Sequence, residues 1–97
     1  LLERVKSFSP LIMARLSAFA QRCPIIQEVR GRGFMIGIEL RVDGRPIVDA
    51  CRQKRLLINC TQEKVLRLLP AMTITKAQLE RALSILEEVL LEFNATA

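Results

Sequence analysis

The sequence predicts an α+β fold: a two-layer sandwich in which a largely antiparallel sheet of about four strands carries helices on one face. Three observations predict it. Apolar residues recur at helical spacing near both ends of the chain, four short strand-like segments lie between them, and tight turns join the strands within each pair. The expected order is α-β-β-α-β-β-α. We expect residues 1–97 to form one domain, because no linker or internal repeat divides them.

The first helix is expected over residues 2–22. Its apolar residues at helical spacing are Leu11, Leu16, Phe19 and Ala20. Ser9 followed by Pro10 is typical of a helix start, so either a second helix begins there or one longer helix is kinked. Pro24 is expected to end the element.

Two strands are expected next, over residues 25–30 and 33–40. The first is rich in β-branched residues and is followed by a glycine-rich turn, Gly31-Arg32-Gly33. The second, GFMIGIEL, is almost continuously apolar, which is typical of a strand buried on both faces. Gly37 inside this run predicts a bulge or a close approach by other backbone.

A turn at Asp43-Gly44 and a short amphipathic helix over residues 46–55 are expected to follow. The inner side of this helix consists of Ile47, Val48 and Cys51. Two further strands are expected over residues 56–59 and 65–69, and Pro70 is expected to end the second.

The last helix begins with a capping-box pattern, in which Thr75 precedes Gln78 by three residues. One face of this helix is apolar and consists of Leu79, Leu83, Leu86, Leu90 and Phe93. Residues 94–97 are expected to form a frayed tail.

The composition limits the kinds of binding partner that we expect for this chain. The apolar fraction, 51%, is high for 97 residues, which indicates either surface intended for something larger or a well-packed small core. The net charge of +5 would suit an anionic partner, but the basic residues are scattered and all four aromatic residues are Phe. We therefore expect no nucleic-acid partner, although a free-standing basic α/β binding module remains the alternative from a different class. The densest basic cluster is Arg52, Lys54 and Arg55.

The cysteines and the absence of histidine exclude several kinds of site. Three cysteines without a CxxC pair, and no histidine, argue against zinc and disulfide frameworks and favour reduced thiols in the cytoplasm. The chain opens without a signal-peptide pattern, and no apolar run approaches the ~18 residues of a membrane span, so no membrane partner is expected.

The residues taken alone predict a non-catalytic module. Histidine, the usual proton shuttle, is missing, and the adjacent pair Glu87-Glu88 is expected to face different ways on a solvated helix surface. The Gly31-x-Gly33 pair precedes a strand instead of opening a helix, so it lacks the context of a dinucleotide-binding loop.

Arg67 stands apart because it occupies the middle of the apolar strand Val-Leu-Arg-Leu-Leu. It is either an ordinary solvent-facing strand residue or a buried cation that awaits an anion. In the second case a carboxylate or a phosphate is the expected partner, since a guanidinium group binds such groups through two parallel hydrogen bonds.

Several segments resemble the class III pyridoxal-phosphate-dependent aminotransferases. Residues 29–40, VRGRGFMIGIEL, are similar to the V-R-G-x-G-L-M-x-G-I-E-L stretch of that family. The later segments LIN, VLRLLP and TIT, at residues 57–59, 65–70 and 73–75, resemble its second block. The likeness runs from about residue 16 to residue 91. One departure is Ala71-Met72, where the family pattern reads Pro-Leu.

The resemblance implies a role for the chain within a larger enzyme. Members of the family have a large domain that holds pyridoxal phosphate on a lysine and a C-terminal small domain that closes over the substrate. This chain resembles the small domain alone, so we expect it to contain no catalytic residue, to bind no cofactor and to be inactive by itself. The four lysines that do not match the motif of the catalytic lysine are Lys6, Lys54, Lys64 and Lys76.

The resemblance also implies partners for the complete enzyme. Arg67 aligns with the arginine that binds the substrate α-carboxylate in this family. The expected partners are amino acid and 2-oxo acid substrates, the large domain of the same chain and a second subunit in a homodimer. 

Overall fold

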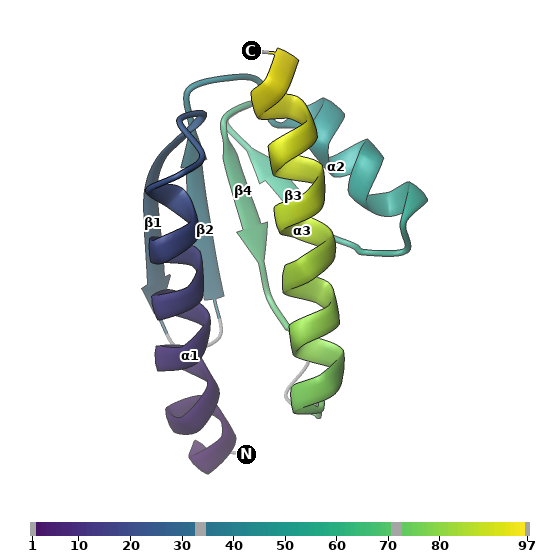
Figure 1. Cartoon of the computed structure of the whole chain (residues 1–97). Coiled ribbons are helices and arrows are strands. Elements are labelled where there is room, and N and C mark those ends of the chain that lie inside the picture. The colour runs from purple at the N-terminus through teal and green to yellow at the C-terminus, as the bar shows by residue number, and fades with distance from the viewer. Residues whose placement is uncertain (1, 33–34, 71–72, 97) are drawn as a thin grey trace.

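The computed structural model describes residues 2–32, 35–70 and 73–96 of the chain (Figure 1). The helices in these residues are α1 (Leu2–Ala20), α2 (Arg45–Gln53) and α3 (Lys76–Thr96). The strands are β1 (Ile26–Arg32), β2 (Met35–Leu40), β3 (Asn59–Thr61) and β4 (Val65–Leu68). The predicted order α-β-β-α-β-β-α is therefore confirmed.

The four strands form one sheet in the order β1-β2-β4-β3, and every neighbouring pair is antiparallel. Helices α1 and α3 lie over the same face of this sheet, and α2 packs beside α3 near β3 (Figure 1). The opposite face carries no helix in the described part of the chain (Figure 1). The predicted two-layer sandwich with helices on one face is confirmed.

One core lies between the helices and the sheet. Its centre is built from side chains of α1, β2, β4 and α3 that are at most 1% exposed: Ile12, Leu16, Phe19, Ile36, Ile38, Leu66, Leu86 and Leu90. Burial of each such side chain contributes about 1.5–3 kcal/mol, so this layer contact is the main source of stability. All four leucines predicted on the apolar face of α3 are buried, and Phe93 packs against the core while partly exposed.

Helix α1 continues through Pro10 as a single element, which decides between the two alternatives for this region. Leu11, one of the residues named for their helical spacing, is 51% exposed, whereas Ile12 is buried. The reason is the 100° turn per residue: Ile12, Leu16 and Phe19 share one face of the helix, and Leu11 lies beside that face.

Strand β2 is buried on one face only, so the expectation of burial on both faces is wrong. Ile36, Ile38 and Leu40 are buried, whereas Met35 is exposed and Glu39 is partly exposed. The described helices cover one side of the sheet. The residues of β2 on the other side include Met35 and Gly37, which make the segment look continuously apolar in the sequence. No bulge occurs at Gly37; the irregularity in the β1–β2 pairing lies between Ile26 and Glu28.

The end of β1 and the start of β3 also differ from the expectations. Strand β1 continues through Gly31 and Arg32, which were expected in the turn; Gly33 lies outside the described residues. Strand β3 begins only at Asn59, because pairing with β4 places Thr61 opposite Val65 and leaves the apolar residues before Asn59 outside the ladder. Ala71-Met72, the departure from the family pattern, also lies outside the described residues.

The two ends of α3 are both fixed by hydrogen bonds. At its start the Thr75 amide donates to Gln78 Oε1 (3.0 Å) and the Gln78 amide donates to Thr75 Oγ1 (3.1 Å), which confirms the capping box. At its end residues 94–96 remain helical and are not a frayed tail, since Asn94 Oδ1 accepts a hydrogen bond from the Ile25 amide (3.2 Å).

Helices α1 and α3 are joined by one charged cluster. Arg15 donates through Nε and Nη2 to the two carboxylate oxygens of Glu87 (3.0 and 2.9 Å), and Nη2 also donates to Ser84 Oγ (2.9 Å). Glu87 is therefore only partly solvated, contrary to expectation, while Glu88 faces outward and pairs with Lys54 (2.9 Å).

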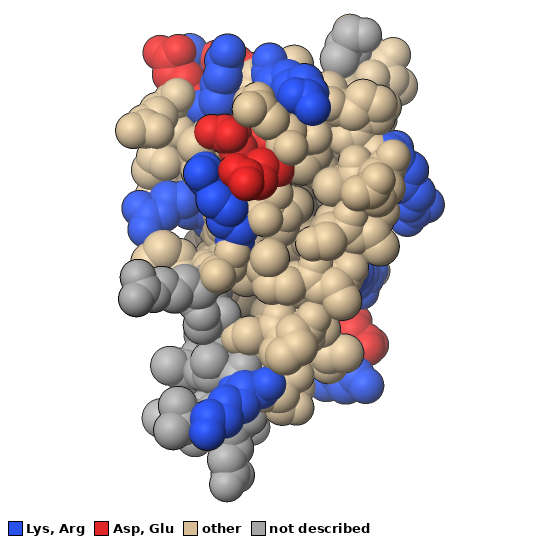
Figure 2. All heavy atoms as spheres, turned by 90° about the vertical axis from the view of Figure 1, so that its left-hand side faces the viewer, with Lys and Arg blue, Asp and Glu red and all other residues tan. Residues whose placement is uncertain are grey.

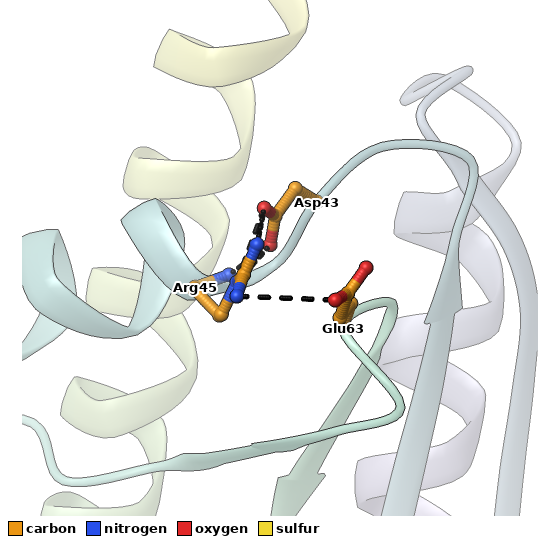
Figure 3. Close-up of polar contacts among 3 residues, drawn as sticks. All are labelled: Asp43, Arg45 and Glu63. Atoms are coloured by element: carbon orange, nitrogen blue, oxygen red, sulfur yellow. Dashed lines mark hydrogen bonds and ion pairs between the residues drawn. The ribbon is translucent and has the colours of Figure 1, made fainter.

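A second charged cluster joins the start of α2 to the turn between β3 and β4 (Figure 3). Arg45 forms an ion pair with Asp43 (2.7 Å) and reaches Glu63 at 3.9 Å. The Gly44 amide donates to the Glu63 carbonyl (2.7 Å), so backbone and side chains bind the two segments together. This contact fixes the turn that leads into β4.

Candidate functional site

Among the rows of residues that cross all four strands on the open face of the sheet, one contains two arginines. In the pairing register Arg30 of β1 lies opposite Gly37 of β2, Gly37 lies opposite Arg67 of β4, and Arg67 lies opposite Asn59 of β3. Because Ile36 and Ile38 point into the core, Gly37 and the rest of the row lie on the side away from the helices. The row thus places two guanidinium groups on either side of a glycine.

A hollow of about 530 Å³ opens over this row. Arg67, Gly37 and Arg30 contribute to its lining, and Met35 and Val65 add apolar surface beside them. The remaining lining residues are Gly31, Thr61 and Gln62. The hollow therefore combines charge with apolar walls, the combination found in sites for small organic acids.

The two arginines of the row differ in their partners. The Arg30 guanidinium lies between two carboxylates, with Nη1 3.5 Å from Glu28 and Nη2 3.7 Å from Glu39. Within the described ranges, no carboxylate lies within 4.0 Å of Arg67. Its Nη2 donates to the sulfur of Met35 (3.2 Å), and a thioether is a weak acceptor. Arg67 is exposed, so the interpretation of a solvent-facing residue is confirmed and that of a buried cation is wrong. None of the described carboxylates pairs with its charge.

The described lysines do not suit a covalent cofactor site. All four lysine side chains are exposed, and none of them lines the hollow that contains Arg67. Lys54 is held by Glu88 and Glu92 on the helix layer, at 2.9 and 4.0 Å. A lysine that carries pyridoxal phosphate must reach the substrate pocket, so the residues of this chain do not fit that group.

The cysteines are placed as packing residues. Cys23 and Cys51 are buried and Cys60 is partly buried, and all three thiols are free. Burial raises the pKa of the Cys51 thiol to about 11 and also raises the pKa of Cys23 and Cys60. No cysteine lines the hollow, and the described residues contain no group of three or more side chains suited to a metal ion.

The basic residues do not form a continuous patch on the face seen in Figure 2, where lysine and arginine side chains are dispersed and acidic side chains lie among them. Eight ion pairs among the described residues place carboxylates next to basic side chains. No helix among these residues is both long enough and apolar enough to cross a membrane.

The model of the family "Aminotransferase class-III" matches residues 1–90. The chain belongs to the class III aminotransferases. Acetylornithine aminotransferase of Methanosarcina mazei is 41% identical over 88 residues, which cover 91% of this chain and 22% of that protein. Ornithine aminotransferase of an Exiguobacterium species is also 41% identical over 88 residues, with the same two shares.

Solved structures of this family have the same fold. Acetylornithine aminotransferase of Elizabethkingia anophelis superposes with a TM-score of 0.85 at 25% identity, covering 93% of this chain and 25% of that one. Ornithine δ-aminotransferase of Plasmodium falciparum gives a TM-score of 0.92 at 23% identity over 98% of this chain and 26% of that chain. The aminotransferase domain described here thus spans about a quarter of the length of these relatives.

Three residues around Arg67 were not predicted as part of a site. Met35, which contacts Arg67, was read only as an apolar strand residue, and the charge neutralisation of Arg30 was not foreseen. Gly37 was noted for its position in a strand but not linked to Arg67. The alternation of side chains along β2 and along β4 indicates which residues share a face of each strand. Only the pairing register places Gly37 opposite Arg67.

Proposed function

We propose that this chain is the small domain of an acetylornithine aminotransferase and supplies Arg67 to bind the substrate α-carboxylate. The activity would be amino transfer from N-acetylornithine to 2-oxoglutarate, a step of arginine biosynthesis in the cytoplasm. The observation that carries the proposal is that Arg67 lines a hollow while no described carboxylate neutralises it. Its place in the VLRLLP segment, which resembles the carboxylate-binding block of the family, supports the same role.

Arg67 has the chemistry that this role needs. A guanidinium group offers two parallel N–H donors to a carboxylate, and charge-assisted hydrogen bonds are worth roughly 1.5–3 kcal/mol each. A carboxylate that enters the hollow replaces the weak Met35 acceptor with a strong one, so little binding energy is lost in releasing Arg67. The apolar surfaces of Met35 and Val65 lie beside the carbon chain of such a ligand.

The proposal assigns the remaining chemistry to another part of the enzyme. Pyridoxal phosphate supplies the electron sink of transamination in this family, and the lysines of this chain do not fit it. The cofactor would therefore be held by a large domain, the complete enzyme would be a homodimer, and the 97-residue chain alone would be inactive. Exposed Leu57 and Leu69, 81% and 73% exposed, line a second, apolar hollow and are suited to contact with that larger domain.

An ornithine aminotransferase is the second candidate. It is favoured by the Exiguobacterium relative, which matches at the same identity as the Methanosarcina mazei protein. Both candidates transfer an amino group to or from acids with an α-carboxylate, so both assign the same role to Arg67.

Substitution of Arg67 tests the proposal in the full-length enzyme that carries this domain. Arg67→Ala should lower kcat/KM for L-glutamate by ~10²-fold or more, because it removes two charge-assisted hydrogen bonds. Arg67→Lys should recover only part of the loss, since an ammonium group cannot form the two-pronged contact.

Two controls make the result specific. n-Butylamine, which has no carboxylate, should react at nearly the same rate in all these variants. Arg41→Ala removes an equal charge outside the hollow, where the Arg41 side chain donates to the Pro24 carbonyl (3.1 Å), and should leave both donors unaffected. If Arg67→Ala slows both donors equally, or neither, Arg67 is a structural strand residue and the proposal fails.

A further inference from the structure

Two glycines in neighbouring strands have opposite surroundings. Gly31 of β1 faces the helices, and a Cβ atom there would clash with Met13 of α1 and lie 3.1 Å from Ile36 Cδ1. Packing of α1 against the sheet therefore accounts for glycine at this position. Gly37 of β2 faces the other way, and a Cβ atom there would meet only Val65 Cγ1 at 3.9 Å and the Arg30 carbonyl at 4.0 Å. Both are ordinary contact distances.

Nothing in the described part of the domain requires glycine at position 37. Its φ does not lie in the left-handed region, and no side chain or backbone segment occupies the space that a side chain would fill. Glycine in the interior of a strand weakens it, because it loses more conformational freedom on folding and contributes no side-chain packing. A glycine that costs stability without serving the domain's own packing marks a place where something else approaches the backbone.

The surroundings of Gly37 indicate what approaches. It is the direct cross-strand neighbour of Arg67 and lines the same hollow. Residues opposite each other in a sheet have side chains about 5 Å apart, so a ligand carboxylate on Arg67 has its next carbon atoms above Gly37. Met35 and Val65, which line the hollow on β2 and β4, bound this space with apolar groups.

We infer that Gly37 is a specificity-determining residue of the carboxylate site. The carbon chain of an amino or 2-oxo acid held by Arg67 lies against the bare backbone of Gly37, and a side chain there would occupy the volume of the carbon atoms next to the carboxylate. The ligand class is an unbranched carboxylic acid. This inference rests on the proposed role of Arg67.

The test compares Gly37→Ala and Gly37→Val in the full-length enzyme. The value of kcat/KM for L-glutamate should fall about 10-fold with alanine and about 100-fold with valine, the range typical of one added methyl or methylene group in a fitted pocket. The value for n-butylamine should change by less than about two-fold, since this donor makes no use of Arg67. The melting temperature should equal or exceed that of the wild type, because both substitutions suit a strand with open space above it.

Gly31→Ala is the matched control, since it adds the same methyl group to the neighbouring strand on the helix side. It should lower the melting temperature, because its methyl group clashes with Met13. For Gly37, no kinetic change, equal slowing of both donors, or a lowered melting temperature with alanine would each overturn the inference. Arg67→Ala is measured alongside: if it discriminates between the donors while the Gly37 variants do not, only the inference fails. If Arg67→Ala does not discriminate either, the proposed function itself fails.

Discussion

Arg30 and Arg67 show how the same side chain acquires different roles from its neighbours. Both belong to one row on the open face of the sheet, but Arg30 is flanked by Glu28 and Glu39, while Arg67 donates a hydrogen bond to the thioether of Met35 and pairs with no described carboxylate. Exposed ion pairs such as those of Arg30 contribute at most about 1 kcal/mol, so their main effect is to cancel its charge. The local field on this face is therefore set by Arg67.

Two consecutive residues of the β3–β4 turn have a backbone conformation that favours glycine. Gln62 has φ 52° and Glu63 has φ 66°, in the left-handed region, where a residue with a Cβ atom is strained by roughly 1–2 kcal/mol. Gln62→Gly should therefore raise the free energy of unfolding by about 0.5–1 kcal/mol, since part of the relief is offset by the greater freedom of glycine in the unfolded chain. Urea unfolding measures this change.

The next residue of the turn provides the matched control. Lys64 is equally exposed, but its φ is not positive, so Lys64→Gly should lower the free energy of unfolding. Equal effects of the two substitutions would show that the turn is not strained at Gln62.

For the residues of the site, the sequence predicts only features that depend on neighbours along the chain. An arginine between apolar strand residues is visible in the sequence, and so is a glycine inside a strand. The contact between Arg67 and Met35 joins residues 32 positions apart and depends on the register of β2 against β4, which no local pattern defines. The strained turn was also hidden, because Gln62 and Glu63 are not turn residues by type.

At the scale of elements, α2 and the β3–β4 turn are coupled by Asp43, Arg45 and Glu63 (Figure 3). Hydrogen bonds from the Arg45 side chain and amide lower the pKa of Asp43 from 3.8 to about 2. A pKa that is lower in the folded state means that the unfolded chain binds the proton more tightly. The resulting stability is fully present above about pH 4 and is lost as the pH falls through 2.

This coupling predicts a pH dependence that one substitution should weaken. The free energy of unfolding should decrease between pH 4 and pH 2, and Arg45→Ala should make the decrease smaller in that window, because the pKa of Asp43 then returns toward 3.8. Arg41→Ala removes the same charge, and Arg41 forms no ion pair with a carboxylate of the described residues, so this variant should keep the wild-type slope. The carboxyl signal of Asp43 followed by NMR through the titration gives the pKa directly.

Helices whose apolar residues recur at regular spacing were predictable from the sequence. Strand boundaries that are set by pairing with a neighbouring strand were not. The face of α3 and its capping box follow from spacing alone, because a helix is stabilised by residues three and four apart. Strand β3 was expected too early, since the apolar residues 56–58 suit a strand by composition while the pairing with β4 begins at Asn59. The single buried face of β2 was missed because a glycine and a methionine at the exposed positions conceal the alternation.

At the scale of the whole molecule, the order of elements and the position of the helices on one side of the sheet were predictable, since tight turns and short amphipathic segments allow few topologies. The open face was not predictable in detail. It is the face that bears the candidate site, and the residues that line it do not belong to the hydrophobic pattern that defines the core.

The three thiols report on the integrity of the whole fold. In the native protein a small alkylating reagent should modify Cys60 first, because Cys23 and Cys51 are buried and burial raises the pKa of both. In denaturant without reductant all three should react, since all are free. Mass spectrometry should therefore find one prompt adduct in buffer and three in denaturant; a pair that stays protected in denaturant would reveal a disulfide.

The helix layer is assembled from the two ends of the described chain, with Arg15 of α1 bound to Glu87 of α3 across 72 positions in the sequence. A ribosome therefore completes all four strands, up to Leu68, before it makes the helix that carries Leu83, Leu86 and Leu90. For that interval the nascent sheet has only α1 on its apolar side, and the surface destined for α3 is bare. Such a surface is prone to aggregation until α3 packs on it, so the docking of the last helix is the step that protects the apolar side of the sheet.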